Sequence, residues 1–197
     1  RRVLNKVGLY MAGKPVYPDF SEVDHVNPED TDPVPGVPIT VGLDFGRSPA
    51  AIFMQNVNDV WTVFSELVGD NESADKFAPK VKKHGAKYYP GFEFNFWGDP
   101  RGGDGQEATE DTGFGIFLKY GMQVLPATSD NNIELRRSSV EMVLNRRNGL
   151  KVNPRALILR RGMAGTTTAR SRAHRACSPR LRSRAHTLTP WMRSRTA

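Results

Sequence analysis

This chain contains little cysteine, no long apolar run and no signal-peptide pattern, and each absence excludes a class of protein. A single cysteine among 197 residues excludes an internal disulfide framework and a cysteine-rich metal site. No apolar stretch approaches the roughly 20 residues that a membrane-spanning helix needs. The first residues lack the charged and apolar regions of a secretory signal. We therefore expect a protein of a reducing, cytoplasmic compartment.

Acidic residues are absent from residues 163–197, which hold eight arginines. Residues 1–162 hold 20 lysines and arginines against 21 aspartates and glutamates, so the net charge of +7 comes from the C-terminal part. The basic balance therefore describes a tail rather than the body of the protein. A chain of this length fits one domain plus tails.

The most informative stretch is residues 39–49, with the sequence I-T-V-G-L-D-F-G-R-S-P. Its first residues are apolar and β-prone, which predicts a strand buried on both faces. The strand ends at Asp44, ahead of a turn through Gly46 and Pro49. An ionised carboxylate in this position is costly to desolvate unless it meets a cation or several donors. Asp44 is therefore either a site residue or a cap on the turn.

The apolar pattern along the chain predicts an α/β fold. Strands are expected at residues 39–44, 50–57, 60–68, 92–97 and 122–125, with strand-like pieces at 150–152 and 156–159. Asn58-Asp59 is typical of a two-residue hairpin turn. Capping signals predict helices at residues 73–83, 112–120 and 132–147. This order indicates a mixed sheet, part antiparallel hairpin and part βα units, with helices on both faces.

Asp99 ends a second predicted strand, in the sequence F-W-G-D-P. Ligands of such sheets gather at the carboxyl ends of strands, so Asp44 and Asp99 converge if their strands are neighbours. Two close carboxylates repel each other unless a cation lies between them, and oxygen ligands suit Mg²⁺ or Mn²⁺. Two such ions can support phosphodiester cleavage. The alternative is that Asp99 only caps a Gly-Asp-Pro turn.

Four motifs resemble, in order and spacing, the nuclease domain of bacteriophage terminase large subunits: V-G-L-D-F-G-R-S-P-A-A-I-F, F-W-G-D-P-R-G-G-D-G-Q, N-N-I-E-L-R and V-N-P-R-A-L-I-L-R-R-G. The resemblance covers residues 13–165 and begins with G-K-P-V-Y-P-D-F, which is similar to the connector that follows the ATPase domain of those proteins. It implies a ribonuclease H-like fold and two-metal-ion cleavage of concatemeric viral DNA during genome packaging. Asp44 and Asp99 would then be catalytic carboxylates that hold Mg²⁺ or Mn²⁺.

The resemblance also implies how the chain is organised. Residues 1–38 would be the connector from a missing ATPase domain, residues 39–162 the nuclease domain, and residues 163–197 a disordered arginine-rich tail. The sequence has no G-x-x-x-x-G-K-[S/T] loop, the mark of an ATPase half. The implied partners are double-stranded DNA and, for the full-length protein, the portal and the small terminase subunit. The implied location is the host cytoplasm, without a membrane.

The tail departs from the family pattern, which continues with a G-G-Y-H-Y-like segment and then S-H-x-x-D-A-L, the source of the third carboxylate. Codons read from the third base of the Gly165 codon permit Tyr-His-Tyr-Arg over residues 166–169. The same shift permits Tyr-Ser-His-Ala-Val-Asp-Ala-Leu from His186 onward, and its Asp is forced by the single codons of Trp191 and Met192. We interpret the tail as the product of a one-base slip that impairs cleavage. The alternative is a native basic arm that contacts DNA phosphates.

Other residues and other functions also fit parts of the pattern. Arg47 and Arg101 flank the two aspartates and are possible contacts to a DNA phosphate. His84 is expected at a helix end without a function, and Trp97 is expected in the core. Two other functions stay open. One is a non-catalytic DNA-binding relic, and the other is a phosphate-binding fragment of the actin-like or sugar-kinase type, which L-D-F-G-R-S also resembles.

Overall fold

The sheet is built around the hairpin that the sequence predicts. The computed structural model describes residues 17–99, 112–127 and 132–165. In it β1 (Ile39–Asp44), β2 (Ala50–Val57) and β3 (Val60–Val68) pair in antiparallel fashion, with the predicted bounds. Asn58 and Asp59 have φ angles of 52° and 62°, the left-handed conformation that a two-residue turn between β2 and β3 requires.

Three parallel strands extend this hairpin on both sides. They are β4 (Phe94–Gly98), which pairs with β1; β5 (Val124–Pro126), which pairs with β4; and β6 (Leu150–Val152), which pairs with β3. The order across the six-stranded sheet is β5-β4-β1-β2-β3-β6. The predicted mixed sheet is therefore confirmed, and its parallel part places β1 beside β4.

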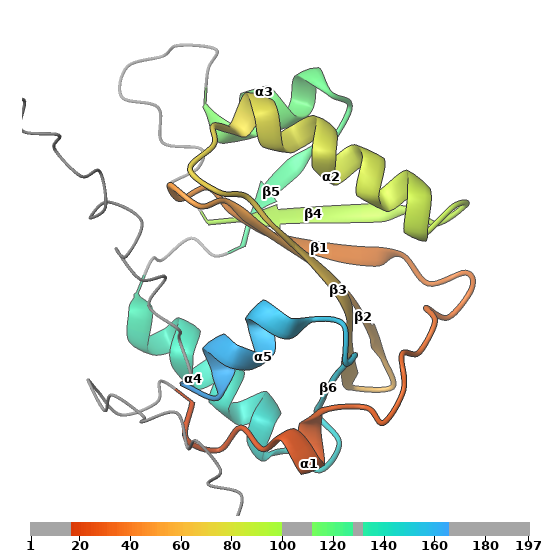
Figure 1. Ribbon diagram of the computed structural model, residues 1–197, viewed down its shortest axis with the longest axis vertical. Coiled ribbons are helices and arrows are strands. Elements are labelled where there is room, and N and C mark those ends of the chain that lie inside the picture. The colour runs from red at the N-terminus through yellow and green to blue at the C-terminus, as the bar shows by residue number, and fades with distance from the viewer. Residues whose placement is uncertain (1–16, 100–111, 128–131, 166–197) are drawn as a thin grey trace, which may run out of the picture. The chain divides into compact units, whose positions relative to one another are not determined.

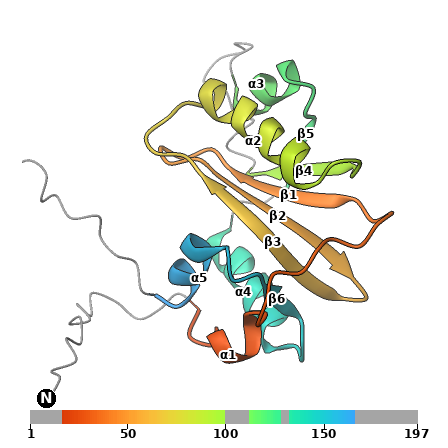
Figure 2. The same ribbon diagram turned by 45° about the vertical axis from the view of Figure 1, so that its right-hand side comes forward.

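Helices cover both faces of the sheet, as predicted (Figure 1, Figure 2). One face carries α2 (Ala74–Tyr88) and α3 (Gly113–Lys119), and the other carries α1 (Glu22–His25), α4 (Ile133–Asn145) and α5 (Leu157–Met163). Each face has its own core. Phe53, Phe77 and Phe117 belong to the cluster under α2 and α3, and Leu144 and Val152 belong to the second cluster.

Helix α2 continues past the predicted end at residue 83 and ends at Tyr88. It includes Gly85, where a Cβ would lie only 3.0 Å from Cζ of Phe94, so the glycine allows close packing on the sheet. The chain then turns back, with the amide of Phe92 donating to the carbonyl of Tyr89, and β4 begins at Phe94 rather than at residue 92.

The prediction of a strand-like piece at residues 156–159 is wrong, because α5 begins there. Its first turn is capped by a distant residue: the Glu66 carboxylate of β3 accepts the amides of Ile158 and Leu159, both at 2.6 Å. A negative charge at a helix N-terminus is stabilising. No pattern within residues 156–159 contains this signal, since the cap comes from another part of the chain.

The described part of the expected connector packs against the domain. Residues 17–38 include the short helix α1. Asn153, which is fully buried, accepts hydrogen bonds from Asn27 and from the backbone and side chain of Thr31, and donates to the Thr31 carbonyl. Buried Gln55 binds the backbone of Val34 in the same way. Two buried amides therefore fix this segment to the sheet.

Parts of the predictions lie outside the described residues. These are the glycine-rich loop after Asp99, with Arg101, and the arginine-rich tail from residue 166 onward. Within the described residues, no helix is long and apolar enough to cross a membrane.

Candidate metal centre

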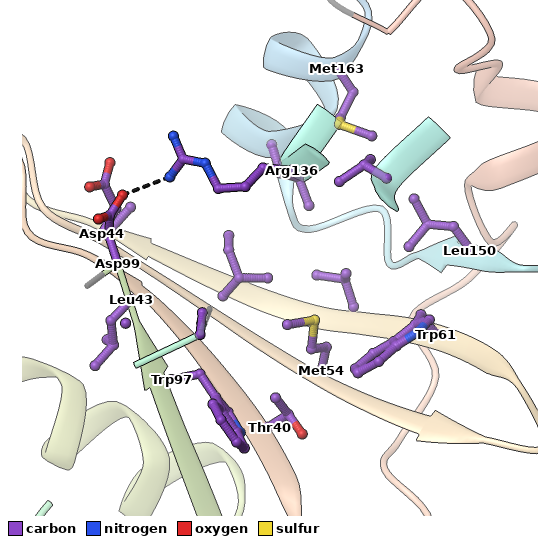
Figure 3. A pocket seen from close by; sticks show the side chains of 18 of the residues that line it. Thr40, Leu43, Asp44, Met54, Trp61, Trp97, Asp99, Arg136, Leu150 and Met163 are labelled. Carbon is purple, nitrogen blue, oxygen red and sulfur yellow. Dashed lines mark hydrogen bonds and ion pairs between the residues drawn. The ribbon is translucent and has the colours of Figure 1, made fainter. Parts of the chain in front are cut away.

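The alternation of side chains along β1 and β4 directs both aspartates to one face of the sheet. Leu43 pairs with Gly98 in the parallel register of these strands, so Asp44 and Asp99 are the next neighbours along it. In-register residues of adjacent strands project to the same side, with backbones about 4.8 Å apart. Figure 3 shows the two carboxylates next to each other at the edge of the same cavity. The predicted convergence of the two carboxylates is therefore present.

The same alternation explains what lies on each face. Ile39, Val41 and Leu43 of β1 are buried toward α2 and α3, whereas Thr40 and Gly42 are half-buried and line the cavity with Asp44. The prediction that β1 is buried on both faces is therefore wrong for the face that carries the site. The open face leaves the strand-end carboxylates accessible to solvent, so Asp44 is not desolvated and the argument from its desolvation cost does not apply.

The cavity beside the aspartates is large and mostly apolar. It has a volume of about 1130 Å³ and lies between the sheet and helices α4 and α5 (Figure 3). Trp97, Trp61 and Met54 line it from the sheet, and Met163 lines it from the end of α5. Trp97 is 38% exposed, so the expectation that it belongs to the core is wrong. It follows Phe96 in β4 and therefore points to the other face, away from the phenylalanine side chains.

Arg136 is the functional candidate that the sequence reasoning missed. Its Nη1 donates to Oδ2 of Asp99 at 2.6 Å, from the first half of α4 (Figure 3). The expected cation beside the carboxylate pair was a metal ion, and here a guanidinium also meets that need. Arg136 lies within the N-N-I-E-L-R motif, but nothing local marks it as part of a site. Its role depends on where α4 packs across the cavity.

Of the two predicted phosphate contacts, Arg47 is among the described residues and Arg101 is not. Arg47 is exposed in the turn that follows Asp44, at the same edge of the sheet as the carboxylates. The same turn passes close to the site, since a Cβ on Gly46 would lie 3.7 Å from Oδ2 of Asp44. Arg101 lies outside the described residues. Arg136 contacts the pair, and Arg47 follows Asp44 by three residues in the chain.

The carboxylate pair suits a hard divalent cation, although it supplies only part of a ligand set. Asp44 is exposed and the Asp99 side chain is 23% exposed, so both can be reached from the cavity. Mg²⁺ and Mn²⁺ prefer such oxygen ligands. Among the described residues, no group of three or more His, Cys, Asp or Glu side chains lies together. A third carboxylate, histidine or cysteine ligand would come from outside the described residues.

A second polar cluster lies on the opposite face, under α2. His84 sits inside α2 rather than at its end, and its Nε2 lies 2.9 Å from Oγ of Ser65 on β3. Its ring stacks on Phe53 at a centroid distance of 4.6 Å. Burial, and then the nearby charges of Lys87 and Arg155, lower the pKa of His84 from its ordinary value of 6.5. The predicted position of His84 is wrong, and the residue connects α2 to the sheet.

The mixed sheet, its helices and the strand order together form a ribonuclease H-like fold. Solved structures with this fold include the large terminase of a thermophilic bacteriophage in complex with ADP, with a TM-score of 0.62, 18% identity, and coverage of 76% of this chain and 36% of that one. The P22 large terminase nuclease domain has a TM-score of 0.57 and 13% identity. The match covers 74% of this chain and 75% of that one. The large terminase nuclease of thermophilic phage G20c with bound magnesium has a TM-score of 0.53 and 10% identity. The match covers 76% of this chain and 79% of that one.

These structural neighbours are phage large terminases and their nuclease domains, as the sequence resemblance predicts. At such low identities the similarity concerns the fold. The chain spans 36% of the ADP-bound large terminase, so it corresponds to one part of that protein. No protein-family model matches the sequence, and no curated protein does so either.

Proposed function

We propose that this chain is the nuclease part of a phage large terminase, which cleaves concatemeric viral DNA during genome packaging with Mg²⁺ or Mn²⁺. The observation that carries the proposal is the pair Asp44 and Asp99, at in-register carboxyl ends of adjacent parallel strands on an accessible face. The G20c nuclease, which has a similar fold, has been solved with bound magnesium. In this proposal residues 1–38 are the connector from an ATPase domain, residues 39–162 the nuclease and residues 163–197 the altered tail.

The chain's own residues have distinct parts in the proposed reaction. Asp44 and Asp99 would hold the divalent ions, which when bound activate a water and stabilise the leaving oxygen. Arg47, in the exposed turn next to Asp44, and Arg101 would contact phosphates of double-stranded DNA. The portal and the small terminase subunit are the proposed partners of the full-length protein, in the host cytoplasm.

We further propose that the altered tail impairs this activity. The described residues contribute two carboxylates to the site. Met163, the last residue of α5, lines the apolar cavity. The tail as encoded is rich in arginine and has no acidic residue, whereas the shifted frame supplies apolar residues and an aspartate. A third carboxylate from that segment would complete the ligand set.

Cleavage of supercoiled plasmid tests the proposed function. A frame-restored chain, in which one base shifts the gene back at the Gly165 codon, should cleave DNA in Mn²⁺ or Mg²⁺, while the chain as encoded should cleave weakly or not at all. Asp44→Asn in the frame-restored chain should reduce cleavage by at least about 100-fold, because it removes a metal ligand.

Asp59→Asn is the matched control, since Asp59 is exposed in the hairpin turn and asparagine tolerates its positive φ. This variant should cleave like its parent. A well-folded frame-restored chain that binds DNA without cleaving it would instead support the non-catalytic relic.

A further inference from the structure

The ion pair between Arg136 and Asp99 differs from a simple surface ion pair because Asp99 is one of the two candidate metal ligands. The guanidinium occupies Oδ2 of Asp99, one of the two oxygens through which this carboxylate could hold a divalent ion (Figure 3). Arg136 also lines the same cavity as both aspartates. A metal ion and the guanidinium are both cations, so they compete for this carboxylate.

The guanidinium group of arginine keeps its charge in proteins. The ion pair is therefore released when a divalent ion displaces the guanidinium or when the arginine side chain moves to another anion. The side chain is 43% exposed, so its outer face is open to a ligand that enters from the cavity. A phosphate offers the same paired oxygens as a carboxylate, and arginine binds both in the same bidentate geometry.

We propose that Arg136 is a positioning residue that couples DNA binding to metal binding: without DNA it neutralises Asp99, and with DNA it transfers to a backbone phosphate and frees Asp99 for a divalent ion. The proposal rests on the proposed function, because it assumes that the pair binds a metal ion and that the substrate is DNA. The alternative is that the ion pair only fastens α4 to the end of β4.

Metal affinity separates these two roles. Mn²⁺ binding to the full chain, followed by electron paramagnetic resonance without DNA, should be at least about threefold tighter in Arg136→Gln than in the unchanged chain, since an exposed ion pair of this kind competes with that strength. Arg137→Gln is the matched control, because Arg137 pairs with Glu141 at 3.0 Å along the same helix. It should leave Mn²⁺ affinity unchanged. When Asp99→Asn is added to both the parent chain and Arg136→Gln, the two proteins should no longer differ in Mn²⁺ affinity.

The coupling itself is tested with a short DNA duplex and Ca²⁺, which occupies oxygen sites. By thermodynamic reciprocity, an ion that releases Arg136 must strengthen duplex binding by the factor with which the duplex strengthens ion binding. Fluorescence anisotropy should therefore show a larger gain in duplex affinity on adding Ca²⁺ for the parent chain than for Arg136→Gln. Arg136→Lys, which keeps the charge and loses the planar fork, should give an intermediate gain.

Several outcomes would overturn the proposal. The first is an Mn²⁺ affinity of Arg136→Gln that is equal to or weaker than that of the parent chain. The second is a gain in duplex affinity on adding Ca²⁺ that is equal in the parent chain and Arg136→Gln. The third is that neither of these two proteins binds Mn²⁺. Thermal unfolding of each variant shows whether it is folded, and Arg136→Lys provides the comparison if Arg136→Gln is not. The proposed function is decided separately by plasmid cleavage in the frame-restored chain.

Discussion

His84 lies half-buried between α2 and the sheet, beside Ser65, Tyr89 and the stacked ring of Phe53. Desolvation opposes its charged form, and Lys87 and Arg155 oppose it further, so the pKa of His84 is lower in the folded protein than its ordinary value of 6.5. The unfolded chain therefore binds this proton first as the pH falls. The stability that neutral His84 contributes is present above pH 6.5 and is lost progressively below it.

We predict that the free energy of unfolding falls between about pH 7 and about pH 5, and that His84→Gln flattens this fall because its side chain does not titrate. Urea titrations at several pH values measure both slopes. Equal slopes for the two proteins would contradict the assignment to His84.

At the scale of single residues, the sequence identified the strand-end carboxylates but not their surroundings. Asp44 and Asp99 could be predicted because each follows an apolar run that ends at a turn, and such positions collect ligands. Arg136 could not, because its contact with Asp99 depends on the angle at which α4 crosses the sheet. Trp97 was misplaced for a simpler reason: alternation along β4 fixes which residues share a face, but not which face has an open cavity.

At the scale of secondary-structure elements, the segment before β1 depends on one buried amide. Asn153 is 0% exposed and forms four hydrogen bonds with Asn27 and Thr31, so it connects β6 to the segment of residues 17–38. Asn153→Ala would remove all four hydrogen bonds and leave unfilled the buried space that the amide occupies. We predict a loss of about 1–3 kcal/mol in the free energy of unfolding, measured by chemical denaturation.

Asn145→Ala serves as the control for this substitution. Asn145 is exposed and donates to Asp19 at 3.0 Å, so the same side-chain truncation should cost about 0.5 kcal/mol or less. Similar losses for the two variants would mean that the buried amide is not what fixes this segment.

Elements whose sequence signals lie within the element itself were predicted more accurately than elements that depend on distant residues. The hairpin of β1, β2 and β3 was predicted to the residue, since β-prone runs and an Asn-Asp turn specify it locally. Helix α5 was missed because its cap, Glu66, lies far away along the chain, on β3. The end of α2 was misplaced because Gly85 is used for packing against Phe94 rather than for a turn.

At the scale of the whole molecule, the charge and the fold belong to different parts of the chain. Residues 1–162 are close to neutral, and the positive excess lies beyond the sheet and its helices. The fold is that of phage large terminase nuclease domains, and the apolar cavity lies where the chain leaves α5. Composition alone would have suggested a basic DNA-binding protein.

The central claim is that Asp44 and Asp99 together bind divalent ions. Anomalous diffraction from crystals of the frame-restored chain soaked in Mn²⁺ tests it most directly. We predict an anomalous peak about 2.1 Å from a carboxylate oxygen of each aspartate, with the guanidinium of Arg136 displaced from Oδ2 of Asp99. Mn²⁺ bound only elsewhere, with the Arg136 ion pair intact at saturating metal, would contradict it.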